Sequence, residues 1–110
     1  MVEYSKDLDR AFHALSDGTR RAILDRLARG PQSVSALAHP FDATLSAIHQ
    51  HIQVLEASGL VETEKVGRVR QCRISRKAVA QVEGWLRARR MLWEERFDAL
   101  GAMLEEDGNA

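Results

Sequence analysis

The spacing of apolar residues changes along this chain, and that change constrains the fold more than any other feature. Up to Gly59, apolar residues recur every three or four positions, as they do on one face of an α-helix. Between Leu60 and Ile74 they alternate with polar residues, as in β-strands, and after Ser75 the helical spacing returns. The sequence therefore predicts a mainly α-helical fold with one β-hairpin and a long last helix.

Capping residues and helix breakers indicate where the helices begin and end. Asp17, Ser33, Thr44 and Ser75 each precede a helical run, and their side-chain oxygens can accept hydrogen bonds from the first free backbone N–H groups. Gly59 stands where a helix commonly ends in the left-handed conformation. The predicted helices cover residues 8–15, 19–29, 34–39, 45–58 and a long run after Ser75, and the predicted strands cover 60–65 and 69–74 around a turn at 66–68.

Length and composition limit what this chain can be. A chain of 110 residues, 45% of them hydrophobic, can bury one modest core, so we expect a single domain over residues 1–106 and a frayed tail at 107–110. No run approaches the roughly 20 apolar residues that cross a bilayer, and the N-terminus lacks a signal-peptide pattern, so we expect no membrane association and a cytoplasmic location. The sequence has no phosphate loop, nucleophile elbow or recognisable carboxylate pair, and we expect no enzyme.

The fourth predicted helix has a polar but almost uncharged outer face. Three- and four-residue steps place its apolar residues on one side and Ser46, His49, Gln50 and Gln53 on the other. Short hydrogen-bonding side chains suit base edges in the major groove of DNA, which accepts a helix. An ordinary solvated helix face usually carries more Lys and Glu. The pattern therefore favours sequence readout.

The predicted hairpin adds basic side chains, Lys65, Arg68 and Arg70, next to that helix. Gly67 allows a tight turn, which lets a hairpin approach a phosphate backbone closely. Residues 65–77 contain six basic and no acidic residues, although the formal net charge of the whole chain is zero. Zero net charge counts against nucleic-acid binding, but a local basic stripe matters more than the sum.

These segments together resemble a known family. ALSDGTRRAILDRLARG, followed by AIHQHIQVLEASGLVETEKVGRVRQCRI, is similar to the ArsR/SmtB-type winged helix-turn-helix regulators, and the resemblance covers nearly the whole chain. It implies a bacterial, nucleoid-associated regulator, in most members a repressor, that binds double-stranded DNA with an inverted-repeat operator as a homodimer. It also implies that Thr44 caps the recognition helix, that Ser46, His49 and Gln50 face DNA, and that His51 faces its own domain.

The chain departs from the family pattern in two places. Gly18 replaces the proline that usually begins the second helix. The cysteines of the metal-responsive branch are absent, because Ser33, Val34 and Ser35 stand at those positions, and no histidine follows His51 for the alternative site on the last helix. We expect no metal site and no cofactor. The four histidines, His13, His39, His49 and His51, also lack the spacing and carboxylate partners of a zinc site.

The apolar stripe of the last helix is longer than a core of this size can cover. Such a helix commonly packs against a symmetry mate, and in this family the first and last helices form the dimer interface. The expected interface consists of Leu8, Phe12, Val82, Leu86, Trp93, Phe97 and Leu100. The aromatic residues of the stripe would also suit a small-molecule pocket, but the dimer is the simpler reading, and any effector stays unknown.

Two alternatives remain open at this point. One is an effector-gated sensor in which a small molecule, or an oxidant at Cys72, shifts the dimer between DNA-competent and incompetent states. Arg70 and Arg73 would lower the pKa of an exposed thiol at this position. A partly buried strand residue is the plainer interpretation of Cys72. The other alternative is a dimeric protein-interaction module that kept the fold but lost DNA binding, for which the zero net charge is the main argument.

Overall fold

The computed structural model describes residues 6–108, which fall into two compact units divided between Val79 and Ala80. Within the described residues, the first unit contains four helices and three strands. The mainly α-helical fold with a hairpin is confirmed, and the expected single domain over 1–106 stays a prediction. In chain order the elements of the first unit are α1 (Lys6–Leu15), α2 (Gly18–Leu27), β1 (Gln32–Ser33), α3 (Val34–Ala38), α4 (Leu45–Ala57), β2 (Val61–Val66) and β3 (Val69–Ile74).

The predicted caps are confirmed by their hydrogen bonds. The Asp17 carboxylate accepts from the backbone N–H groups of Thr19 (2.8 Å) and Arg20 (3.1 Å) at the start of α2. The hydroxyls of Ser33, Thr44 and Ser75 accept in the same way from the backbone three residues later. The capping oxygens thus fix where four helices begin, whereas α2 and α3 end one or two residues earlier than the sequence predicts.

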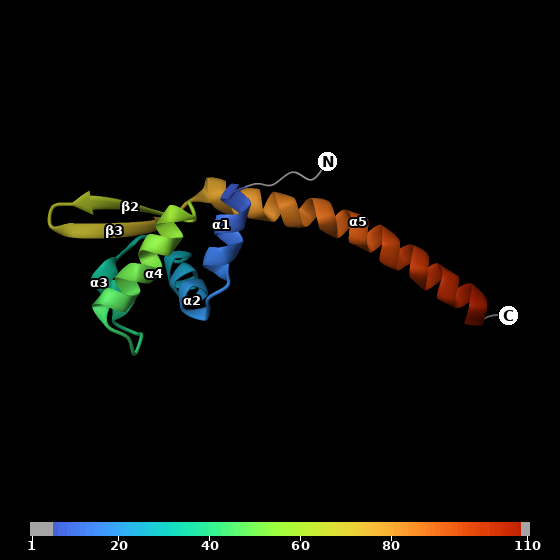
Figure 1. Ribbon diagram of the computed structural model, residues 1–110, viewed down its shortest axis with the longest axis horizontal. Helices are drawn as coiled ribbons and strands as arrows, with labels where there is room; N and C mark the ends of the chain where they lie inside the picture. The colour runs from blue at the N-terminus through green and yellow to red at the C-terminus, as the bar shows by residue number, and fades with distance from the viewer. Residues whose placement is uncertain (1–5, 109–110) are drawn as a thin grey trace. The chain divides into compact units, whose positions relative to one another are not determined.

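The sheet has one strand more than the sequence predicts. Its order is β1-β3-β2, and both pairings are antiparallel. Gln32 and Ser33 form β1 by pairing with Cys72 and Gln71 of β3. The β2–β3 hairpin turns at Gly67, whose φ of +64° is a left-handed conformation that glycine adopts without steric cost. Figure 1 shows this turn lying away from α2 and α4.

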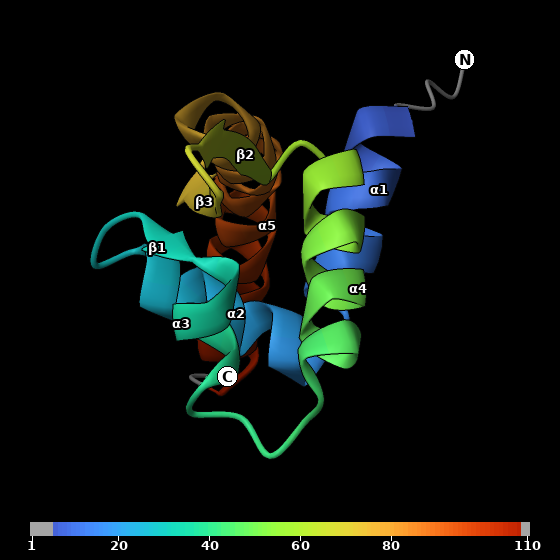
Figure 2. The same cartoon turned by 90° about the vertical axis from the view of Figure 1, so that its left-hand side faces the viewer.

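Helix α4 lies at the centre of the first unit. It contacts α1, α2, α3 and β2, and Figure 2 shows it running beside α1. The apolar side predicted for this helix is confirmed, because Ile48, Ile52 and Leu55 are fully buried. Gly59 ends the helix with a φ of +82°, as expected for the residue after a C-cap. The position of α4 is therefore fixed by packing on one side, and its other side is exposed.

The second unit contains most of helix α5 (Arg76–Gly108), whose first residues belong to the first unit. At 33 residues it is about 50 Å long. Its exposed large apolar residues include Leu86, Trp93, Phe97 and Leu100. No helix in the described part of the chain is both long and apolar enough to span a membrane. Since α5 continues to Gly108 and residues 109–110 lie outside the described residues, the frayed tail at 107–110 stays a prediction.

Candidate nucleic-acid interface

The outer face of α4 presents the predicted readout residues to solvent. Ser46, His49, Gln50 and Gln53 are all exposed, and none of them is an Asp, Glu, Lys or Arg. Thr44 is also exposed, and its hydroxyl accepts a hydrogen bond from the backbone N–H of Ala47 at 3.1 Å. This cap fixes where α4, and with it the outer face, begins. The structure thus brings together all five residues that the sequence assigned to the recognition helix. Their contact with DNA stays a prediction.

A buried arginine holds the opposite side of α4 against the rest of the unit. Arg20 is 9% exposed, and its guanidinium donates to the carbonyls of Ala14 (Nε, 2.7 Å) and His13 (Nη2, 3.1 Å), at the end of α1. Its Nη1 lies 3.4 Å from Nδ1 of His51 on α4. His51 therefore faces its own unit, as the resemblance implied, and is separate from the outer face that carries His49.

The Asp17 carboxylate completes this cluster. It lies 3.9 Å from Nδ1 of His51 while capping α2. The hydrogen bond from the backbone N–H of Arg20 is the largest cause that lowers the pKa of Asp17, and the charge of His51 acts in the same direction against partial burial. Asp17, Arg20 and His51 thus connect the α1–α2 corner to the recognition helix.

One face of the hairpin continues the side of the sheet that is buried in the core. Lys65 and Arg70 are direct cross-strand partners, and they continue the face that carries Thr63 and the buried Cys72. Arg70 Nη1 donates to Thr63 Oγ1 at 2.6 Å, and Thr63 in turn donates to Glu56 of α4 at 3.1 Å. These bonds position the Arg70 side chain relative to α4.

Lys65 and Arg68 are the other two basic residues assigned to the wing. Both are exposed, and neither forms an ion pair within the described part of the chain. Arg68 lies in the turn at the end of the hairpin, next to Gly67. The structure therefore leaves both cations available to an anionic partner.

The opposite face of the hairpin is not basic, because it carries two acids and one arginine, and this corrects the uninterrupted basic stripe read from the sequence. Arg73 Nε lies 3.0 Å from the carboxylate of Glu62, and its Nη1 lies 3.5 Å from that of Glu64. Both acids come from β2, and Glu62 is the cross-strand partner of Arg73. The acids precede residue 65 in the chain and so were absent from the stripe, but strand pairing brings them beside it.

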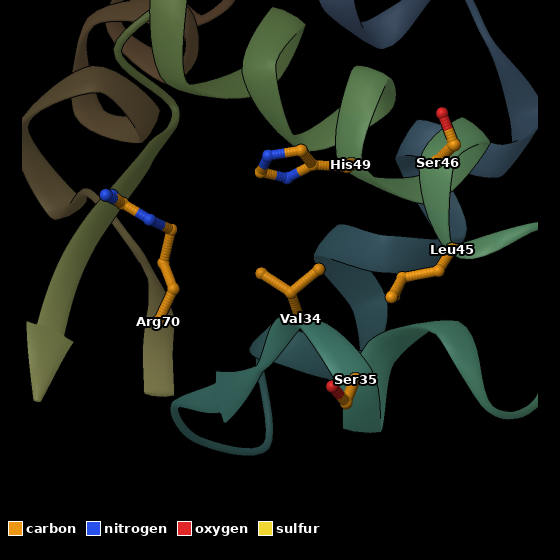
Figure 3. A pocket seen from close by; sticks show the side chains of 6 residues that line it. All are labelled: Val34, Ser35, Leu45, Ser46, His49 and Arg70. Carbon is orange, nitrogen blue, oxygen red and sulfur yellow. The ribbon is translucent and has the colours of Figure 1, made fainter. Parts of the chain in front are cut away.

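A hollow of about 470 Å³ lies between the recognition helix, α3 and the hairpin (Figure 3). Leu45, the first residue of α4, is 55% exposed there. Leu45 is not among the residues that the sequence pattern marks as functional. Its one local signal is that a large apolar residue begins a helix whose exposed face is otherwise polar. The lining residues are Val34, Ser35, Leu45, Ser46, His49 and Arg70.

Cys72 is fully buried, which removes the condition on which the oxidation sensor depends. Desolvation is the largest cause that raises the pKa of the Cys72 thiol, and Glu56 adds to it, while Arg70 opposes both. Arg73, the second arginine invoked for an activated thiol, points to the other face of the hairpin and is paired there. The structure therefore favours a core residue over a reactive thiol.

The residues assigned to the dimer interface fall on α1 and α5. On α1, Phe12 is exposed and Leu8 is half-buried. On α5, Val82 is buried, whereas Leu86, Trp93, Phe97 and Leu100 are exposed.

No three His, Cys, Asp or Glu side chains of the residues that the structure describes are arranged to hold a metal ion.

Comparison with known proteins identifies the family. Residues 15–64 match the helix-turn-helix domain family. The HTH-type transcriptional regulator Rv2034 of Mycobacterium tuberculosis is 51% identical over 53 residues, which make up 48% of this chain and 50% of that protein. The chain thus spans about half the length of this curated relative.

Two solved structures extend the likeness over most of the chain. The crystal structure of the ArsR family transcriptional regulator RHA00566 has a TM-score of 0.77 and 49% identity, covering 86% of this chain and 97% of that one. The homodimeric winged helix-turn-helix DNA-binding domain of Mb0332 from Mycobacterium bovis, a possible ArsR-family regulator, has a TM-score of 0.64 and 29% identity over 80% of this chain and 88% of that one. By its fold and its sequence, the chain belongs to the ArsR family of winged helix-turn-helix transcriptional regulators, a family of DNA-binding proteins and not of enzymes.

Proposed function

We propose that this chain represses transcription by binding an inverted-repeat operator as a homodimer. In this proposal α4 enters the major groove and the hairpin contacts the phosphate backbone. The observation that carries it is the exposed, uncharged outer face of α4 beside a hairpin that presents Lys65 and Arg68 without internal ion pairs. The first surface can read bases, and the second can supply affinity.

The apolar stripe on α5 supports the homodimer. Leu86, Trp93, Phe97 and Leu100 are spaced so that they share one side of the helix, and all four are exposed. An exposed apolar face of this extent on one chain calls for a protein partner. The Mb0332 domain is homodimeric, and we assign the stripe to a second copy of this chain, together with Leu8 and Phe12. Val82 was also expected in this interface, but it is already buried within the single chain.

Symmetry then sets the form of the operator. A two-fold dimer presents two recognition helices, so its site is an inverted repeat whose half-site centres are about 10 base pairs or a multiple of that apart. Repression follows if the dimer covers a promoter and excludes polymerase. The sign is taken from the family resemblance, in which most members repress.

The proposal assigns base recognition to Gln50 and phosphate contact to Arg68, and these two roles can be measured separately. Duplexes selected by the protein from a random library, together with unselected DNA, provide the probes for fluorescence anisotropy. Gln50→Ala should reduce the preference for selected DNA by about 1–3 kcal/mol, because Gln50 would lose contacts to base edges. Arg68→Ala should weaken binding to both DNAs about equally and lower the salt slope by about 1.

Arg73→Ala is the matched control for Arg68→Ala. It removes the same side chain from the same hairpin, but that side chain is paired with Glu62 and Glu64. The salt slope of this variant should stay near that of the wild type. Equal losses on both DNAs for Gln50→Ala and Arg68→Ala would contradict these separate roles, and failure of the library to yield any preferred duplex would favour the protein-interaction module.

A further inference from the structure

The hollow between α3, α4 and the hairpin has an apolar part on a face that is otherwise polar. In Figure 3 the side chains of Val34, Leu45 and His49 point toward the same space, whereas Ser46 and Ser35 point away from it. Leu45 is 55% exposed at this place. A single exposed leucine is ordinary on a protein surface, so its position has to carry the argument.

Leu45 lies next to the outer face of α4, which carries the predicted base-contacting residues. Leu45 and His49 are four residues apart on α4 and are therefore neighbours on the same side of the helix. A duplex that contacts His49 would therefore also lie over Leu45 and shield its side chain from water. The nearby Arg70 on the hairpin gives the same hollow a positive edge, which suits a nucleic-acid occupant.

Among the base edges in the major groove, only thymine presents a methyl group, on its C5 atom. Cytosine has no methyl group there, and the purines present polar N7 and O6 or N6 atoms that an apolar side chain would leave without hydrogen bonds. We infer that Leu45, backed by Val34, is a specificity-determining residue that contacts the 5-methyl group of a thymine in each operator half-site. This inference rests on the proposed function, since it places α4 in the major groove.

The test removes only the methyl group. Duplexes selected from the random library are resynthesised with deoxyuridine in place of thymine, one position at a time and symmetrically in both half-sites, and their affinities are measured by fluorescence anisotropy. At one position the wild type should bind about fourfold more weakly for each half-site, which corresponds to loss of one buried methyl contact. For Leu45→Ala the ratio of affinities for thymine and deoxyuridine duplexes should fall to about one at that position.

Val69→Ala is the matched control. Val69 is an exposed apolar residue, 45% accessible, on the hairpin face opposite Lys65 and Arg70. This variant should keep the wild-type thymine-to-deoxyuridine ratio even if its overall affinity changes. Alanine has a high helix propensity, and circular dichroism checks that Leu45→Ala folds.

The outcomes separate this inference from the function on which it rests. If the wild type selects a preferred duplex but is indifferent to deoxyuridine at every thymine, the role of Leu45 is wrong and the regulator proposal stands. The same holds if Leu45→Ala keeps the wild-type ratio. If no duplex is preferred over unselected DNA, the proposed function fails and the inference fails with it.

Discussion

At the scale of single residues, Asp17 makes two interactions whose contribution to stability depends on pH. Its carboxylate caps α2 through two backbone N–H groups and lies near His51 of the recognition helix. The capping hydrogen bonds lower its pKa in the folded state below the ordinary value of 3.8. The unfolded chain therefore takes up this proton first as the pH falls.

The pH dependence of stability should reveal this carboxylate. A lowered folded-state pKa gives stability that is fully present well above pH 4 and is lost as the pH falls through the folded-state value. We expect the urea midpoint of the wild type to fall between pH 5 and pH 3, and that of Asp17→Asn to fall less, because the amide still accepts a capping bond but does not titrate. Parallel midpoints for the two proteins across this range would contradict the assignment.

At the scale of elements, the position of α4 depends on how Arg20 joins three helices. Arg20 belongs to α2, its guanidinium donates to the last carbonyls of α1, and it approaches His51 on α4. The carbonyls of Ala14 and His13 lie in the last turn of α1, where the helix supplies no further backbone donors four residues on, and Ser16 bonds only the carbonyl of His13. Removing the guanidinium takes the Nε donor from the buried carbonyl of Ala14, whereas the carbonyl of His13 keeps the backbone N–H and the hydroxyl of Ser16 as donors.

Arg20→Met should lower the free energy of unfolding by about 2–4 kcal/mol, since it removes charged hydrogen bonds in a buried place while keeping most of the side-chain volume. Arg21→Met is the matched control: Arg21 is exposed and donates to the carbonyl of Leu15 at 2.6 Å, so its loss should cost clearly less. Urea unfolding followed by circular dichroism measures both. Equal losses in the two variants would show that Arg20 is an ordinary helix cap.

Most elements were predictable because their signals are local. Each cap lies next to the helix that it begins, and the change from helical to alternating spacing marks the hairpin. Strand β1 was missed because two residues, Gln32 and Ser33, show no periodicity, and they become a strand only by pairing with β3 about 40 residues later. Elements defined by distant partners leave little trace in their own sequence.

The candidate site also has a part that local sequence predicts and a part that depends on distant partners. The outer face of α4 follows from helical spacing alone, and all of its predicted residues are exposed. The pairing of Arg73 with Glu62 and Glu64 depends on strand register. That register follows once the two turn residues are known to be Gly67 and Arg68. The apolar hollow at Leu45 needed the placement of α3 and β3 beside α4, and nothing local to Leu45 contains that information.

At the scale of the whole molecule, the proposal requires two chains. Phe97 is 69% exposed on the apolar stripe of α5. Phe97→Glu should raise the dimer dissociation constant at least about 100-fold, because a carboxylate would be buried without a partner in the interface. Sedimentation velocity measures the change, and operator affinity should fall with it.

Glu95→Lys is the control for this variant. Glu95 is exposed on the same helix, and the helical period places it on the side opposite the stripe. This change of charge should leave the dimer intact. If Phe97→Glu is also dimeric and binds DNA normally, the stripe has another partner and the α5 interface is wrong.

Fluorescence-anisotropy titration of wild-type protein on DNA from upstream of its own gene, with scrambled DNA as competitor and across a salt series, tests the central claim most directly. We expect at least about 10³-fold preference for one duplex, two chains per duplex, and affinity that falls steeply with salt as phosphate contacts release counterions. Equal, weak binding to the upstream and scrambled duplexes, repeated with duplexes enriched from a random library, would contradict sequence-specific regulation by this chain.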